Sequence, residues 1–171
     1  MTSGPISPRP SHARPWRPFL EIYSNPALSW AHLETLPERT RLPVVLKGIL
    51  HPDDARRAFE LGGDAIVVSN HGGRQVDRAI ASLDALVSIR EAFGRQPVVL
   101  FDSGLRTGTD LFVALALGAD ACLLGGPHIY GLALDGVASV VENVMAELDL
   151  TMGLTGVGSI PDLVPGLLTR T

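Results

Sequence analysis

The stretch AIVVSNHGGRQ, residues 65–75, joins a short apolar run to a polar segment that begins where the run ends. Three further apolar runs follow the same plan: PVVLK at 43–47, PVVLF at 97–101 and ACLLG at 121–125. Continuous apolar runs of this length, rich in β-branched residues, are typical of strands buried on both faces of a parallel sheet. The four runs therefore predict four parallel strands with polar residues at their carboxyl ends.

The segments that follow these runs have helical periodicity. They predict helices over residues 51–63, 82–94, 109–118 and 135–148. Ser82 and Thr109 are the expected N-caps of the second and third of these helices. Strands alternating with helices indicate βα units, so the sequence predicts an α/β fold with four such units and no repeat of sequence between them.

Two architectures fit four βα units. A complete TIM (β/α)8-type barrel needs about 200 to 250 residues, and this chain has 171 residues. Four units would therefore make half of such a barrel. An open, doubly wound four-stranded sheet fits the periodicity equally well. In both architectures the functional residues lie at the carboxyl ends of the strands.

The composition excludes several classes of function. A formal charge of −4, with 46% hydrophobic and 19% charged residues, indicates a folded domain and argues against general affinity for nucleic acid or an anionic membrane surface. No apolar run approaches the roughly 20 residues that cross a bilayer. The five histidines show no ligand spacing, so no metal site is predicted. The single cysteine, Cys122, favours a reducing, cytoplasmic compartment.

The chain divides into three parts by composition. Residues 1–15 are rich in proline and arginine, lack the apolar core of a signal peptide and are expected to be a disordered tail. Residues 16–163 form the expected domain, and residues 164–171 form a C-terminal tail.

Every predicted strand ends in residues suited to chemistry. Lys47 and Gly48 follow the first strand, and SNHGGRQ at 69–75 follows the second. The third strand leads into DSGLRTG at 102–108, and the fourth into Gly-Gly-Pro at 125–127. Glycines ahead of a helix let backbone N–H groups approach an anion, so the last two segments predict phosphate-binding loops.

Four motifs around these strand ends resemble the C-terminal half of the FMN-dependent α-hydroxy acid oxidases and dehydrogenases, the family of glycolate oxidase, lactate oxidase and lactate monooxygenase. They are LPVVLKGILHPDDARRA (42–58), AIVVSNHGGRQ (65–75), VVLFDSGLRTGTD (98–110) and ALALGADACLLGGP (114–127). The resemblance covers about residues 16–163, with the motifs in the family's order. It implies that the four strands are the fifth to eighth of a TIM (β/α)8-type barrel.

The resemblance implies FMN as cofactor and a small, lactate-like L-2-hydroxy acid as substrate. It implies that His71 is the catalytic base and contacts the substrate, and that Arg74 binds the substrate carboxylate. Lys47 would lie beside the pyrimidine edge of the flavin, and Ser69 would hydrogen-bond the ring. The other implied cofactor-binding residues are Asp102, Ser103, Gly104, Leu105, Arg106, Gly125 and Gly126.

The sequence also departs from the family's pattern. Most relatives carry an arginine where this chain has Gly126, which predicts weaker FMN binding. The family's first four strands supply an FMN cradle, substrate-binding tyrosines and an aspartate that orients the catalytic histidine, and these motifs are absent here. Activity is therefore expected to need a complementing half or a homo-oligomer.

Two other interpretations remain at the level of sequence. The chain could be a non-catalytic truncated remnant or interaction module that keeps the motifs by descent. A phosphate-binding barrel, such as an inosine-phosphate dehydrogenase or an aldolase, would share the two glycine loops. That second interpretation does not explain SNHGGRQ at 69–75.

Overall fold

The computed structural model describes residues 25, 27–36, 38–134 and 136–169. Four parallel strands form one sheet in the order β1-β2-β3-β4. They are β1 (Val45–Ile49), β2 (Ala65–Val68), β3 (Val98–Phe101) and β4 (Ala121–Cys122). The four predicted strands are therefore confirmed, in chain order across the sheet. The predicted tail at 1–15 lies outside the described residues.

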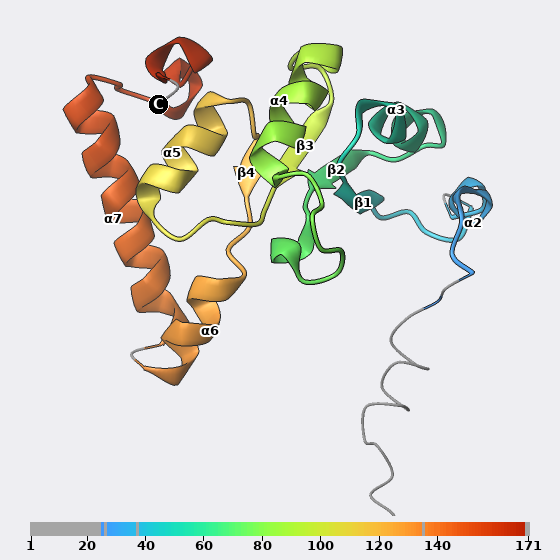
Figure 1. Ribbon diagram of the computed structural model, residues 1–171, viewed down its shortest axis with the longest axis horizontal. Coiled ribbons are helices and arrows are strands. Elements are labelled where there is room, and N and C mark those ends of the chain that lie inside the picture. The colour runs from blue at the N-terminus through green and yellow to red at the C-terminus, as the bar shows by residue number, and fades with distance from the viewer. Residues whose placement is uncertain (1–24, 26, 37, 135, 170–171) are drawn as a thin grey trace, which may run out of the picture.

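All four predicted helices are present: α3 (Pro52–Glu60), α4 (Ser82–Phe93), α5 (Gly108–Ala116) and α7 (Val137–Thr155) (Figure 1). Two α-helices were not predicted, α2 (Trp30–Glu34) and α6 (Gly126–Ala133). Pro127 in the first turn of α6 is a helix-start signal, although the segment Gly-Gly-Pro at 125–127 was predicted to be a phosphate-binding loop. Short 3-10 turns complete the structure at η1 (His71–Gly73), η2 (Ile160–Asp162) and η3 (Pro165–Leu167).

The predicted caps of two helices were wrong. Thr107, not Thr109, caps α5, and its hydroxyl and Asp110 form a reciprocal capping box. Ala81 precedes α4, so Ser82 is the first helical residue. The Ser82 hydroxyl donates instead to the carbonyl oxygen of Ser103, 3.3 Å away. This hydrogen bond ties the start of α4 to the end of β3.

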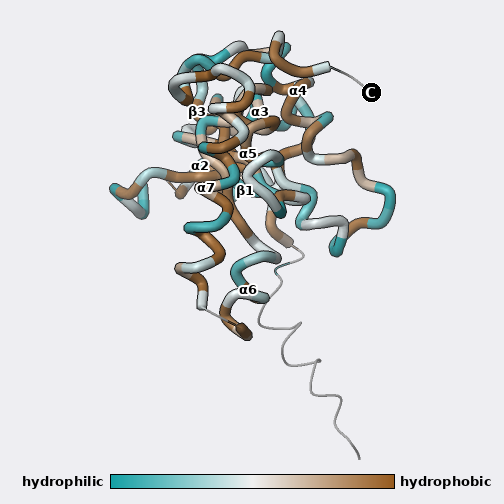
Figure 2. Tube along the Cα trace, turned by 90° about the vertical axis from the view of Figure 1, so that its left-hand side faces the viewer, coloured by the Kyte–Doolittle hydropathy of each residue, from teal (hydrophilic) through white to brown (hydrophobic). Residues whose placement is uncertain are grey.

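The helices cover one face of the sheet. The other face is partly exposed at β1 and β3. Ile66, Val68 and Val99 are fully buried against the helices. On the opposite face, Val45 and Val98 are 44% and 47% exposed, although both lie in register with buried Ala65. Burial on both faces therefore holds for β2 but not for β1 and β3. Figure 2 shows hydrophobic segments in the middle of the molecule and also at the end of α6, where Leu132 and Leu134 are 69% and 80% exposed.

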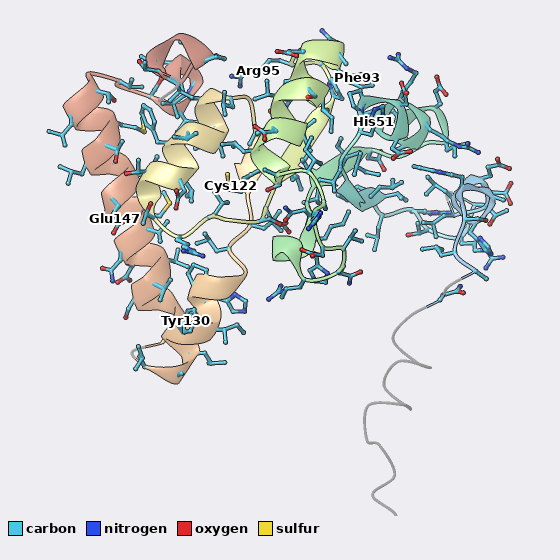
Figure 3. All side chains as sticks on the ribbon, viewed as in Figure 1. His51, Phe93, Arg95, Cys122, Tyr130 and Glu147 are labelled. Carbon is cyan, nitrogen blue, oxygen red and sulfur yellow. The ribbon has the colours of Figure 1, made fainter. Side chains whose placement is uncertain are left out.

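The helices pack closely where α5 meets α7. A Cβ on Gly108 would lie within 2.5 Å of backbone atoms of Glu147 and Val144, so the two helices need a residue without a side chain there. The Gly108 amide, at the start of α5, donates to the carboxylate of Glu147 on α7, 2.7 Å away (Figure 3). No helix among the described residues is long and apolar enough to span a membrane.

Two aspartates fasten the starts of the strands in the same way. The Val44 amide donates to Asp64 Oδ2 at 2.6 Å, and the Val99 amide donates to Asp120 Oδ2 at 2.7 Å. In return, the Asp64 amide donates to the Val44 carbonyl oxygen and the Asp120 amide donates to the Val99 carbonyl oxygen, both at 2.9 Å. These aspartates lie in LGGDA (61–65) and LGADA (117–121), which differ at one position. The βα units therefore do contain a short sequence repeat, contrary to expectation.

A buried arginine joins four segments at this same end of the sheet. Arg90 on α4 is 9% exposed and forms an ion pair with Asp120, with 2.7 Å between Nη2 and Oδ2. Its guanidinium also donates to the carbonyl oxygens of Gly118, Pro97 and Gly94, at 2.7, 2.8 and 3.0 Å. The arginine thus connects α4, the loop into β3, the end of α5 and the start of β4.

We expect Arg90→Ala to lower the free energy of unfolding by about 3 to 5 kcal/mol, because it leaves Asp120 and three carbonyl oxygens without their charged donor. Urea denaturation followed by circular dichroism measures this loss. Arg95→Ala is the matched control, since Arg95 makes one 3.4 Å contact, to the Leu163 carbonyl oxygen. Equal losses in the two variants would contradict the stabilising role of Arg90.

Candidate functional site

An open cleft of about 1140 Å³ lies at the carboxyl ends of the strands. Its lining includes residues 70–74 after β2, 101–106 after β3 and 125–127 after β4. Most of the predicted site residues meet there: His71, Arg74, Asp102, Ser103, Gly104, Leu105, Arg106, Gly125 and Gly126. Lys47 and Ser69 are not part of the lining, and they connect to it through Asp102.

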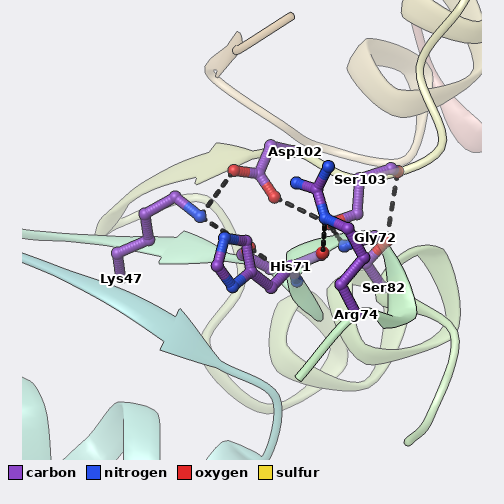
Figure 4. A network of polar contacts seen from close by, with 8 residues as sticks. Lys47, His71, Gly72, Arg74, Ser82, Asp102 and Ser103 are labelled. Carbon is purple, nitrogen blue, oxygen red and sulfur yellow. Dashed lines mark hydrogen bonds and ion pairs between the residues drawn. The ribbon is translucent and has the colours of Figure 1, made fainter. Parts of the chain in front are cut away.

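An ion pair links β1 to the end of β3. The Lys47 ammonium lies 2.8 Å from Asp102 Oδ2 and also donates to Ser69 Oγ at 2.8 Å (Figure 4). Lys47 lies in register with Val67, two residues before Ser69, so its long side chain reaches along the sheet to the strand ends. The lysine side chain is 49% exposed, which leaves its ammonium open to a further partner.

The environment of Asp102 favours its ionised form. Burial acts to raise the pKa of this carboxyl group, but hydrogen bonds from Lys47, Ser69 and Ser103, with the charge of Lys47, outweigh it. The net result is a pKa below the ordinary value of 3.8. At neutral pH the site therefore holds a stable ammonium–carboxylate pair.

The segment that carries the imidazole is a tight turn, η1. His71 and Gly72 have positive φ angles of 57° and 66°. The His71 amide donates to Ser69 Oγ at 3.2 Å, and its carbonyl oxygen accepts from Arg74 Nε at 3.2 Å. No hydrogen bond to the imidazole itself is found among the described residues. The η1 turn thus leaves the His71 imidazole exposed. Through the His71 carbonyl oxygen, it also constrains the orientation of the Arg74 guanidinium.

The two predicted phosphate segments differ in how many backbone donors they offer. The amides of Arg106 and Thr107 both donate to Asp110 Oδ2 at 2.9 Å, so they are already used. Leu105 is 6% exposed and packs in the core. Gly125 and Gly126 border open space, and the first amides of α6 lack intrahelical acceptors.

Several polar residues at the cleft were not predicted from sequence. Asp110 was missed, although Thr107 followed three residues later by an acidic residue is a capping-box pattern. Asn70 was not singled out either; its Nδ2 donates to the Ile80 carbonyl oxygen at 3.2 Å, and its buried Oδ1 has no hydrogen-bond partner among the described residues. No local pattern in the sequence indicates the contact between Asn70 and Ile80.

Metal and thiol chemistry find no support in the described part of the chain. No group of three or more histidine, cysteine, aspartate or glutamate side chains there could hold a metal ion. Burial raises the pKa of the Cys122 thiol to about 11, so this group stays protonated at neutral pH.

Comparison with known proteins decides the family. Residues 7–170 match the sequence profile of FMN-dependent dehydrogenases. The chain belongs to this family. The predicted resemblance is thereby confirmed, and with it a partial TIM (β/α)8-type barrel.

Individual relatives agree with this assignment. An FMN-dependent alpha-hydroxy acid dehydrogenase of Penicillium citrinum is 53% identical over 137 residues, which are 78% of this chain and 34% of the relative. An L-lactate oxidase of Lysinibacillus sphaericus is 51% identical over 147 residues, 84% of this chain and 38% of the relative. A mandelate oxidase variant, solved with a monooxide FMN adduct, superposes with a TM-score of 0.74 at 44% identity.

The chain spans less than half the length of the proteins it matches. The superposition on the mandelate oxidase covers 78% of this chain and 44% of that one. The predicted site roles, the lactate-like specificity and the compartment stay predictions.

We expect the stability contributed by Asp102 to fall as the solution is acidified. A carboxyl pKa below 3.8 in the folded state means that ionisation stabilises the fold above this pH and that the contribution is lost as pH falls below it. Asp102→Asn should therefore destabilise the protein at pH 7, with a difference from the parent that shrinks as pH falls toward the folded-state pKa.

Urea unfolding at pH 7, 5, 4 and 3 measures this pH dependence. Asp162→Asn serves as the control, because Asp162 accepts from the Ser159 hydroxyl at 2.6 Å and has no ion pair within the described ranges. A destabilisation by Asp102→Asn that stays constant over the whole series would contradict the prediction.

Proposed function

We propose that this chain supplies reacting residues for the oxidation of a small L-2-hydroxy acid to the 2-oxo acid, with FMN as electron acceptor. One observation carries the proposal. The His71 imidazole, the Arg74 guanidinium and the Lys47–Asp102 ion pair lie together at the carboxyl ends of the strands. The chain that carries them belongs to an FMN-dependent family. A lactate-like acid is favoured over a larger one by the similarity to an L-lactate oxidase.

The residues present fit FMN in their chemistry. Lys47 offers a cation for negative charge on a flavin ring, and Ser69 offers a hydroxyl beside it. Gly125, Gly126 and the exposed Arg106 suit a phosphate at the other end of the cleft. The cleft, at about 1140 Å³, has room for a cofactor and a small acid. When bound, FMN supplies the acceptor for the two electrons of the oxidation.

The chain's own residues handle the proton and the carboxylate. Oxidation of a 2-hydroxy acid removes two electrons and two protons, and we assign the hydroxyl proton to the His71 imidazole, because imidazole is the side chain most often used as a general base. The terminal nitrogens of Arg74 bind the substrate carboxylate through two parallel hydrogen bonds. Because Arg74 Nε is bonded to the His71 carbonyl oxygen, the carboxylate clamp and the base move as one unit.

A further part of the barrel completes the site in this proposal. The apolar side chains of Val45 and Val98 face the side of the sheet that helices do not cover. Four more strands, in the same or another chain, or a second copy of this one, would bury them. They would also provide the carboxylate that orients His71 in the family.

The proposal is tested by titrating the chain with FMN and adding L-lactate without oxygen, both for the chain alone and for the chain mixed with a segment that supplies the other four barrel strands; turnover is expected where the barrel is completed. We expect saturable quenching of flavin fluorescence, followed by loss of the visible flavin absorbance. His71→Ala should keep the binding and abolish the bleaching, because it removes the base and no implied flavin contact. His32→Ala, on α2, is the control and should bleach like the parent.

Other outcomes separate the competing interpretations. No saturable binding at high FMN would favour a non-catalytic remnant or interaction module. Loss of FMN binding in His71→Ala, or bleaching of its flavin at the parent's rate, would contradict the role of His71 as the base. Bleaching by mandelate but not by L-lactate would contradict the lactate-like specificity.

We also expect Gly126→Arg to tighten FMN binding by about tenfold to a hundredfold, since a charged hydrogen bond to a phosphate contributes about 1.5 to 3 kcal/mol. A Cβ at Gly126 meets no atom within 4 Å, so the backbone leaves space for a side chain to begin there. Gly158→Arg adds the same charge at another open position, outside the cleft lining. Equal tightening in both variants would show a general charge effect rather than a phosphate contact.

A further inference from the structure

Ser103 adopts a backbone conformation that its side chain disfavours. Its φ angle is +80°, in the left-handed region, and Gly104 follows with a φ angle of +85°. A residue with a Cβ is strained there, whereas glycine is not. Such strain persists only where surrounding contacts hold the residue in place. The contacts of the Ser103 side chain therefore show what this serine does.

The Ser103 hydroxyl bridges two strand ends. It donates to Asp102 Oδ1 at 2.8 Å and accepts from the Gly72 amide at 3.0 Å (Figure 4). The backbone carbonyl oxygen of Ser103 accepts from the hydroxyl of buried Ser82 at 3.3 Å. The one proton of the hydroxyl is used by Asp102, so it is not available to donate to a phosphate oxygen.

These bonds complete a ring that begins and ends in the turn η1. The His71 amide donates to Ser69 Oγ, which accepts from Lys47, and Lys47 pairs with Asp102. Asp102 accepts from Ser103, which accepts from the Gly72 amide. Two consecutive amides of the strained turn are thus held by two serines, and both serines are tied to the same ion pair. Ser103 is the link on one side.

We propose that Ser103 is a positioning residue, which holds the His71–Arg74 turn to the Lys47–Asp102 ion pair. A displacement of that pair is transmitted to the Gly72 amide through the Ser103 hydroxyl, beside the separate route from Lys47 through Ser69 to the His71 amide. Without the hydroxyl, the Gly72 amide has no acceptor among the described residues, and the turn is held through Ser69 alone. The inference rests on the proposed function only for what His71 and Arg74 do.

Amide hydrogen exchange of the full chain, measured by NMR without flavin or substrate, tests this link. Ser103→Gly removes the hydroxyl and relieves the backbone strain, while Ser103→Ala removes the hydroxyl and keeps the strain. We expect exchange of the Gly72 amide to accelerate at least tenfold in both variants, with the Val99 amide in β3 changing less than threefold. Ser159→Ala, which breaks another serine–aspartate bond, should leave Gly72 unchanged.

A second comparison tests the connection to the ion pair. Asp102→Ala should accelerate Gly72 exchange in the parent, but less than twofold further when Ser103 is already glycine, because the link is then gone. A merely structural serine would give the same effect of Asp102→Ala in both backgrounds.

Three results would overturn the proposal: unchanged Gly72 exchange in both Ser103 variants, Gly72 and Val99 accelerating in parallel, or additive effects of Asp102→Ala and Ser103→Gly. Since no flavin enters these measurements, they are independent of the FMN and L-lactate titrations. A failure of the link and a failure of the proposed function are therefore distinguishable.

Discussion

The Lys47–Asp102 ion pair, at 2.8 Å, is the contact through which three strand ends form one site. Parallel register places Ser69 and Asp102 side by side, two residues beyond Val67 and Leu100. Lys47 is in register with Val67, so only a long side chain reaches from β1 to that row. Ser69 and Ser103 connect this pair to the His71 and Gly72 amides of the η1 turn.

Stability and chemistry are placed at opposite ends of the sheet. At the amino ends, Asp64 and Asp120 fasten the strand starts, and Arg90 is fully engaged with an ion pair and three carbonyl oxygens. At the carboxyl ends, His71 and Ser103 have positive φ angles, and side chains remain open to the cleft. A barrel tolerates such strain because the packing of strands and helices at the other end does not depend on the loops.

Much of the site could be predicted because it is local in sequence. SNHGGRQ at 69–75 and DSGLR at 102–106 directly follow apolar runs, and strand ends in a parallel sheet must share an edge. Both segments belong to the four motifs that carry the resemblance to the family. The features that were not predicted are marked by only one or a few residues. They are the start of α6 at Gly-Gly-Pro, the Thr107 cap, and the Leu-Gly-x-Asp-Ala repeat that leads into β2 and β4.

By itself, the sequence determined the four strands, the helices between them and which loops carry reactive groups, because periodicity and residue type are local properties. The tertiary structure alone decided that Ser103 bonds to the Gly72 amide 31 positions away and that Arg90 reaches Asp120. It also decided that Val45 and Val98 are exposed while Ala65 between them is buried. These outcomes depend on strand register, backbone angles and the elements that pack over each face, which no single segment encodes.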